Sequence, residues 1–109
     1  MPMKFKHVAL AAMAVLAASG ASAMDAAAAK ALASKSACLA CHAADKKLVG
    51  PAYKDVAAKY ADQADAKDQL IQSIRQGSKG KWGQMAMPPQ AQLSAGDAQK
   101  LALWVLKIK

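Results

Sequence analysis

Two cysteines and a histidine, Cys38, Cys41 and His42, stand in the pattern C-x-x-C-H. This spacing is the signature of covalent attachment of a c-type haem. The two thiols can add across the two vinyl groups of a haem to form thioethers, and the histidine that follows is carried under the iron as its proximal ligand. The motif therefore predicts one covalently bound haem c, attached to Cys38 and Cys41 and ligated by His42.

Other sites that use the same residue types fit the sequence less well. A redox-active dithiol of the thioredoxin kind needs a βαβ context, and the chain has no pattern of alternating strands and helices. A structural zinc site needs four cysteine or histidine ligands, and the only further candidate is His7, near the N-terminus. A disulfide between Cys38 and Cys41 would leave His42 without a role. Haem attachment accounts for all three residues.

The ligand on the other face of the iron decides the function. Beyond residue 23, His42 is the only histidine, which excludes a bis-histidine site within one chain, but Met85 and Met87 lie in a long loop. Met87 precedes Pro88-Pro89, and a residue before proline is pushed into an extended conformation. This stiff segment can hold a thioether against the iron without a helix, so we expect Met87 rather than Met85 as the ligand.

An iron closed on both faces would pass electrons and bind no substrate. With an open sixth position, the chain would instead be a haem enzyme of the peroxidase kind or a gas sensor, and this is the alternative hypothesis. A small peroxidase would need distal acid–base residues, and no second histidine follows residue 23 to supply one. The sequence therefore favours an electron carrier that is not an enzyme.

The N-terminus has the features of an export signal. A basic start with Lys4 and Lys6 precedes an apolar run over residues 8–18, and Ala21-Ser22-Ala23 reads as a cleavage site. The apolar run is shorter than the roughly 20 residues that span a bilayer, so no stable membrane insertion is expected. We predict a cleaved signal peptide at residues 1–23 and a single domain at residues 24–109, located in a bacterial periplasm.

The chain is basic, with 15 Lys and Arg against 7 Asp and Glu and a formal net charge of +8. Such a surplus suits acidic docking surfaces on redox partners, chiefly by steering their approach. Nucleic acid is not expected as a partner, because an exported haem domain has little access to it. Five lysines lie near the attachment motif or the methionine loop in sequence and are candidates for the docking surface: Lys35, Lys46, Lys47, Lys79 and Lys81.

The spacing of apolar residues predicts an all-α fold. The expected helices cover, in order, residues 26–37, a segment with Pro51 in its first turn, residues 65–76 and a segment capped by Ser94. Residues 78–93 have no periodicity and form one long, ordered loop. The expected architecture is therefore about four helices and a long loop carrying the methionine ligand, packed around one covalent haem.

Five segments stand in a characteristic order: the C-x-x-C-H motif, residues 49–57, residues 77–83, Met87-Pro88-Pro89, and residues 101–106. This order resembles the small class I cytochromes c of the bacterial cytochrome c-551 type, over nearly all of residues 24–109. The resemblance implies the class I cytochrome c fold and a monomeric, periplasmic electron carrier. It also implies His42 and Met87 as axial ligands. Its implied partners are an upstream cytochrome complex and a terminal reductase or oxidase.

The resemblance implies further roles around the haem. The carbonyl of Pro51 would accept a hydrogen bond from the free ring N–H of His42 and so fix the orientation of the ligand. Trp82 would donate to a haem propionate. Gln90 stands where related chains often have an asparagine that hydrogen-bonds the methionine sulfur. Ser73 replaces an arginine that some members place near a propionate, which predicts a more solvated propionate here.

Overall fold

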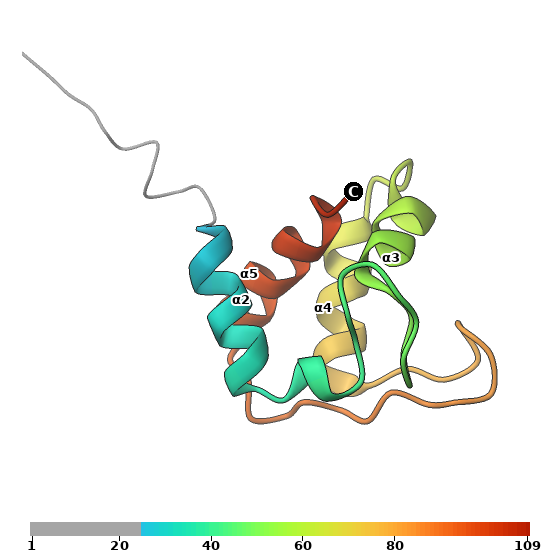
Figure 1. Ribbon diagram of the computed structural model, residues 1–109, viewed down its shortest axis with the longest axis horizontal. Coiled ribbons are helices and arrows are strands. Elements are labelled where there is room, and N and C mark those ends of the chain that lie inside the picture. Colours follow the sequence, from blue (N-terminus) through green and yellow to red (C-terminus); the bar gives the residue numbers. More distant parts are fainter. Residues whose placement is uncertain (1–24) are drawn as a thin grey trace, which may run out of the picture.

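The protein is described by a computed structural model of residues 25–109 (Figure 1). The elements follow the order α2 (Ala26–Lys35), η1 (Cys38–Ala40), α3 (Tyr53–Tyr60), α4 (Ala66–Gln76) and α5 (Ala95–Leu106). Over this range there are four α-helices and a short 3₁₀-helix, so the all-α class is confirmed. The expected signal peptide, residues 1–23, lies outside the described residues.

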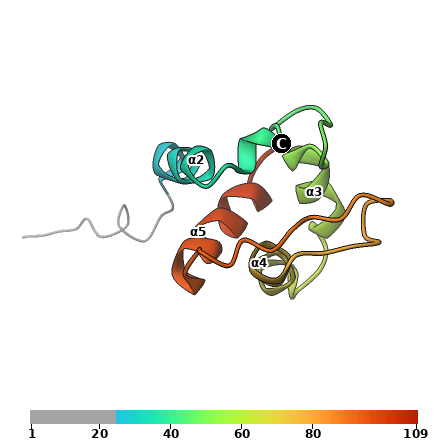
Figure 2. The same ribbon diagram turned by 90° about the horizontal axis from the view of Figure 1, so that it is seen from below.

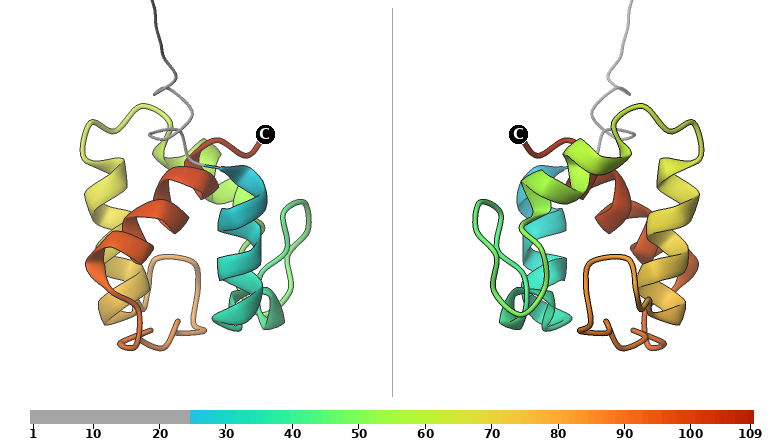
Figure 3. Two further views of the ribbon diagram at one scale, coloured as in Figure 1. Left: turned by 90° about the vertical axis from the view of Figure 1, so that its left-hand side faces the viewer. Right: turned by 90° about the vertical axis from the view of Figure 1, so that its right-hand side faces the viewer.

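Helix α5 is the centre of the packing. It contacts α2, α3 and α4, and Figures 2 and 3 show it crossing between α2 on one side and the α3–α4 pair on the other. Its buried face consists of Ala98, Leu101, Ala102 and Val105, which follow the i, i+3, i+4, i+7 spacing of one helical stripe. No helix within residues 25–109 has the length and apolar character needed to cross a membrane.

The ends of α4 and α5 agree with the sequence. Gly77 ends α4 with a φ of 81°, a backbone conformation that favours glycine. The Ser94 side chain accepts a hydrogen bond from the Asp97 N–H at 3.0 Å and caps the start of α5. Both boundaries were predicted from residue type alone.

Two other boundaries differ from the prediction. Helix α2 ends at Lys35, and Ala37 instead takes a left-handed conformation with a φ of 65°. Pro51 lies before α3 and not in its first turn, because Ala52 is the extended N-cap residue and the helix begins at Tyr53. The carbonyl of Pro51 is thereby left outside the helix and free to bond elsewhere.

The loop after α4 is folded back on itself. Ser78 and Met87 form an isolated antiparallel bridge, with Met87 N–H donating to Ser78 O at 2.8 Å and Ser78 N–H donating to Met87 O at 3.1 Å. The loop continues from Met87 under the ends of α4 and α5, and Gln90 N–H donates to the Ile74 carbonyl at 2.8 Å. This confirms the expected long, ordered loop.

Candidate haem site

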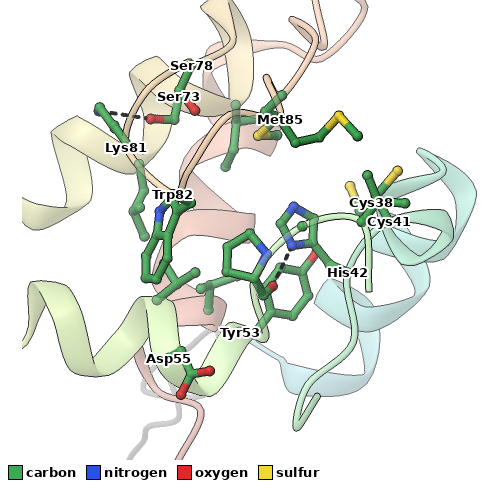
Figure 4. A pocket seen from close by; sticks show the side chains of 18 of the residues that line it. Cys38, Cys41, His42, Tyr53, Asp55, Ser73, Ser78, Lys81, Trp82 and Met85 are labelled. Atoms are coloured by element: carbon green, nitrogen blue, oxygen red, sulfur yellow. Dashed lines mark hydrogen bonds between the residues drawn. The ribbon is translucent and has the colours of Figure 1, made fainter. Parts of the chain in front are cut away.

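A cavity of about 270 Å³ opens between the segment that follows α2 and the loop that follows α4 (Figure 4). Its inner wall consists of buried apolar side chains from α3, α4 and α5, among them Val56, Leu70, Leu101 and Val105. The predicted site residues that line it are Cys38, Cys41, His42, Pro51, Ser73, Trp82, Met85 and Met87. Residues from both halves of the chain thus meet in one place.

The attachment motif reaches the cavity through a tight turn. Ala37, in its left-handed conformation, turns the chain from α2 into η1, which begins at Cys38. The Cys38 carbonyl accepts hydrogen bonds from the N–H groups of Cys41 at 3.2 Å and His42 at 3.0 Å. This single turn brings two free thiols and an imidazole onto the same wall.

The imidazole of His42 is oriented by a hydrogen bond and a stacked ring. Its Nδ1 lies 2.8 Å from the Pro51 carbonyl, drawn as a dashed line in Figure 4. A carbonyl oxygen can only accept, so Nδ1 carries the proton and Nε2 keeps a free lone pair, as a metal ligand requires. The Tyr53 ring stacks on His42 with centroids 4.9 Å apart, and Trp104 meets the edge of Tyr53 at 5.4 Å.

The loop around His42 is closed by backbone hydrogen bonds. Gly50 N–H donates to the Cys41 carbonyl at 2.7 Å, and Tyr53 N–H donates to the Ala43 carbonyl at 2.9 Å. A Cβ atom on Gly50 would lie 2.6 Å from Cε1 of His42, far inside van der Waals contact. Only glycine therefore fits beside the ring in its observed position.

Met85 and Met87 are held differently from each other. The Met87 backbone is bonded to Ser78 through both its N–H and its carbonyl, and its side chain is partly buried. Met85 lies two residues before this pairing and is 66% exposed. Gly77 lies against this anchor, because a Cβ atom there would be 2.6 Å from the Met87 carbonyl oxygen. Both thioethers line the cavity, but only Met87 has an anchored backbone.

The polar edge of the cavity contains Trp82 and two lysines. The ammonium of Lys59 lies 4.8 Å from the centre of the Trp82 ring, and the ammonium of Lys81 donates to Ser73 Oγ at 3.3 Å. Figure 4 shows Lys81, Ser73 and Trp82 together at one side of the cavity. The neighbourhood of Ser73 is therefore more basic than its side chain alone predicts.

The Gln90 side chain contacts other groups of the loop. It is not among the cavity-lining residues, and its side-chain amide donates to the Pro88 carbonyl at 3.3 Å and accepts from Gln92 at 3.1 Å. Its backbone N–H is tied to the Ile74 carbonyl, which keeps this part of the loop turned toward α4. In this conformation Gln90 supports the course of the loop and does not face the cavity.

The five lysines named from sequence proximity do not form one group. Lys47, Lys79 and Lys81 line the haem cavity. Lys46 is exposed but does not line it, and Lys35 borders a separate depression beside Gln90 and Asp97. Three of the five lysines named from sequence proximity therefore line the cavity, whereas Lys35, at the end of α2, lies at the other depression.

Burial affects the two titratable groups on the attachment side. It raises the pKa of the Tyr53 phenol, so the ring stacked on His42 stays protonated and neutral at physiological pH. Burial is also the main cause of the raised pKa of the Cys38 thiol. Both shifts reflect an apolar wall with little access to water.

Three contacts of this site were not anticipated from the sequence. They are the Tyr53–His42 stack, the close approach of Gly50 to His42, and the pairing of Ser78 with Met87. The sequence pattern predicts Tyr53 as one more residue of an apolar helical stripe, and it predicts Gly50 as an ordinary loop residue. A glycine directly before proline and eight residues after the histidine is the one signal that could have suggested a close backbone approach.

The residues present suit a haem c. Two thiols lie on one wall beside an imidazole with a free Nε2, thioethers line the facing loop, and the space between them is bounded by apolar side chains. Within residues 25–109, no three His, Cys, Asp or Glu side chains gather in a way that could hold a bare metal ion. An iron carried by a flat apolar macrocycle fits this donor set better than a free ion does.

Comparison with known proteins agrees with this chemistry. The family model described as Cytochrome c matches residues 26–109. Cytochrome c-551 of Pseudomonas aeruginosa is 51% identical over 102 residues, covering 94% of each chain. Cytochrome c-552 of Nitrosomonas europaea is 53% identical over 78 residues, covering 72% of this chain and 76% of that one.

Solved structures are similar in fold as well. The crystal structure of wild-type Nitrosomonas europaea cytochrome c552 has a TM-score of 0.72 at 51% identity, covering 73% of this chain and 99% of that chain. The class 1 cytochrome MtoD of Sideroxydans lithotrophicus has a TM-score of 0.67 at 33% identity, covering 79% of this chain and 98% of that chain. The expected class I fold is thereby confirmed.

Proposed function

The chain belongs to the cytochrome c family, and on this premise we propose that Cys38 and Cys41 bind haem c through thioethers, with His42 and Met87 as axial ligands. The family carries one covalent haem c, and the protein is a small c-type cytochrome electron carrier. The proposal adds the identity of the ligands, a closed iron coordination, the periplasm as compartment after cleavage of residues 1–23, and the docking face for partners.

The observation that carries the proposal is the meeting of four side chains at one cavity. Cys38, Cys41 and His42 line it from the turn after α2, and Met87 lines it from the loop after α4. The Pro51 carbonyl holds the Nδ1 proton of His42 and leaves Nε2 available to the iron. That hydrogen bond also increases the basicity of the ligand and fixes the plane of its ring.

Met87 is favoured over Met85 by its anchored backbone. The two hydrogen bonds to Ser78 and the prolines that follow fix where the Met87 side chain begins. Met85 would have to leave solvent and order an exposed part of the loop in order to ligate, at a cost in conformational entropy. A ligand that is already in place binds the iron more tightly, because no such ordering opposes it.

Electron transfer then depends on what the chain does around the haem. When bound, haem c supplies an iron that alternates between the ferrous and ferric states, and ligation by His and Met favours the ferrous state. The apolar residues Val56, Leu70 and Val105 keep water from the inner wall. Ligands held in fixed positions require little rearrangement when the charge changes, which favours fast exchange.

The mouth of the cavity has the properties of a transient docking face. The large hydrophobic side chains that are exposed in residues 25–109 are Leu48, Val49 and Met85, and the last two line the cavity. Lys47 and Lys79 lie on the same rim. An apolar centre with a basic surround suits an acidic redox partner that binds briefly. Raising the ionic strength should slow exchange with such a partner.

The visible spectrum of the purified protein tests the ligands. We expect covalent c-type bands and the weak far-red methionine-to-iron band in the ferric state. Met87→Ala should abolish the far-red band and open the iron to carbon monoxide, whereas Met85→Ala, the matched control, should keep the band. Loss of the band only in Met85→Ala would reassign the ligand. Ready uptake of carbon monoxide by the native protein would support the open-site enzyme or sensor instead.

A further inference from the structure

We propose that Lys81 and Ser73 together bind a carboxylate of the haem at the edge of the cavity formed by α4 and the following loop. The inference rests on the proposed function, since it requires haem in this cavity. Both residues line the cavity, and the Lys81 ammonium already donates to Ser73 Oγ at 3.3 Å. A haem carries two propionate carboxylates at one edge, which need polar partners when the apolar ring is buried.

Positive charge is in excess at this edge of the cavity. The Lys59 ammonium lies over the Trp82 ring, the Lys81 ammonium bonds to Ser73, and Lys79 lines the same cavity. None of these ammonium groups has a carboxylate partner within residues 25–109, where the only ion pair joins Lys100 to Asp97. Like charges gathered without a counter-ion repel each other, so the arrangement becomes favourable when an anion binds among them.

Contacts fix this corner of the loop. The Lys59 ammonium donates to the Lys81 carbonyl at 3.4 Å and packs over the Trp82 ring. Lys59 thus links α3 to the loop at Lys81, the residue that bonds to Ser73 on α4. The hydroxyl of Ser73 is half-buried in the α4 wall and can donate to an oxygen that the Lys81 ammonium also contacts.

The other charged groups at the cavity do not replace Lys81. Asp55, on α3, is the one acidic residue among those that line the cavity, and it is exposed. Lys47 lines the cavity from the loop that carries the attachment motif. Lys81 is the lysine that bonds to a cavity-lining side chain. The sequence alone predicts a solvated propionate near Ser73. With Lys81 bonded to Ser73, we expect instead that this propionate pairs with the Lys81 ammonium.

The midpoint potential of the holoprotein, measured at one neutral pH and low ionic strength, tests the pairing. Removing a positive charge near the haem favours the ferric state. We expect Lys81→Gln to shift the equilibrium with a reference redox couple roughly three- to tenfold toward the ferric form, the effect of one charge at short range in a partly buried site. Lys81→Arg, which keeps the charge, should restore most of the original potential.

Lys67→Gln is the matched control, because Lys67 is exposed on α4 and does not line the cavity. We expect it to leave the potential nearly unchanged. Equal shifts in Lys67→Gln and Lys81→Gln would overturn the inference, since they would reflect net charge alone. An unchanged potential in Lys81→Gln, with altered salt dependence of exchange with an acidic partner, would assign Lys81 to partner docking and also overturn it.

A second readout is independent of the potential. In the reduced holoprotein, the Lys81 ammonium protons should be visible by nitrogen-edited NMR because a paired ammonium exchanges slowly with water, and Ser73→Ala should weaken that signal. The absence of the signal in the native protein would contradict the pairing. The visible spectrum separates this result from the proposed function: native His/Met bands in Lys81→Gln leave the proposed ligation intact whatever the potential does.

Discussion

The histidine side and the methionine side of the cavity are held in different ways. On the histidine side, His42 is enclosed by contacts from residues close to it in sequence: the Pro51 carbonyl, the Tyr53 ring and the backbone of Gly50. On the methionine side, Met87 is fixed through its backbone pairing with Ser78, at the base of a largely exposed loop. Of the two proposed ligands, His42 is packed on several sides and Met87 is held only through its backbone.

This difference indicates which side of the site opens first when the protein is destabilised. Local opening has its lowest cost where few apolar contacts are buried and the backbone hydrogen bonds are exposed. The loop over residues 79–86 meets that description, whereas the His42 loop is closed against α3 through Tyr53. We therefore expect the methionine to leave the iron under mild stress while the histidine and the helices remain in place.

The largest expected effect comes from crowding the histidine side with Gly50→Ala. The added methyl group would lie 2.6 Å from Cε1 of His42, and the ring has no free space because Pro51 and Tyr53 hold it. We expect a loss of about 3 kcal/mol in the free energy of unfolding, at the upper end for overpacking, together with altered low-spin spectral bands. Denaturant titration of the holoprotein measures the loss.

Gly96→Ala is the control for this substitution. Its Cβ atom would meet nothing closer than Ser94 Oγ at 3.9 Å, within a helix. Stability should stay the same or rise by up to about 1 kcal/mol, because alanine favours helix over glycine. If Gly50→Ala were as harmless as Gly96→Ala, the histidine side would not be tightly packed.

An intermediate effect is expected on the methionine side from Gly77→Ala. Gly77 has a φ of 81° and a ψ of 173°, a region populated almost only by glycine, and its Cβ atom would lie 2.6 Å from the Met87 carbonyl oxygen. We expect a loss of about 2 kcal/mol, concentrated in the loop. The far-red methionine band should disappear at a lower denaturant concentration than the helical circular dichroism signal.

The separation of those two transitions is the decisive measurement. In Gly50→Ala, the gap between the two transitions should narrow, because the substitution destabilises the packed region that contains His42 and leaves the methionine side unchanged. If Gly77→Ala showed a single transition, the two sides would form one cooperative unit, and the methionine side would not open first.

The smallest effect is expected at Ala37, the left-handed residue before the attachment motif. Ala37→Gly relieves a backbone strain of roughly 1–2 kcal/mol in the folded state. It also increases the conformational entropy of the unfolded chain, which lowers stability by about 0.5–1 kcal/mol. The result should be a stabilisation of at most about 1.5 kcal/mol, measured as a small rise in the denaturation midpoint. Ala40→Gly, one turn later at an ordinary φ, should instead destabilise slightly; a matching loss at Ala37 would show that no strain is stored there.

Local sequence signals predicted the helices and the attachment motif well. Ser94, Gly77 and the stripe on α5 each act through bonds or contacts a few residues away, which is why α4 and α5 were found with nearly correct boundaries. The C-x-x-C-H motif is local in the same sense. The start of α3 was misplaced because proline tolerates both the first turn of a helix and the extended residue before its cap.

Contacts between segments that are distant in the sequence could not be predicted from the sequence. The bond from Lys81 to Ser73 and the pairing of Ser78 with Met87 depend on how the loop returns to α4. The position of Gln90 depends on the same path, and its amide turns to Pro88 instead of the cavity. A family resemblance indicates which group a residue usually contacts. It does not show which contact is made where a neighbouring residue is replaced, as at Ser73.

The cavity joins parts of the chain that are made at different times. Cys38 and Cys41 belong to the first half of the sequence, whereas Met87 and Leu101 on the opposing walls belong to the last quarter. The thiols come from the segment after α2, and the opposing wall is complete only once α5 has docked. Under the proposed attachment, the pocket for the tetrapyrrole is therefore finished only when the last helix has been synthesised.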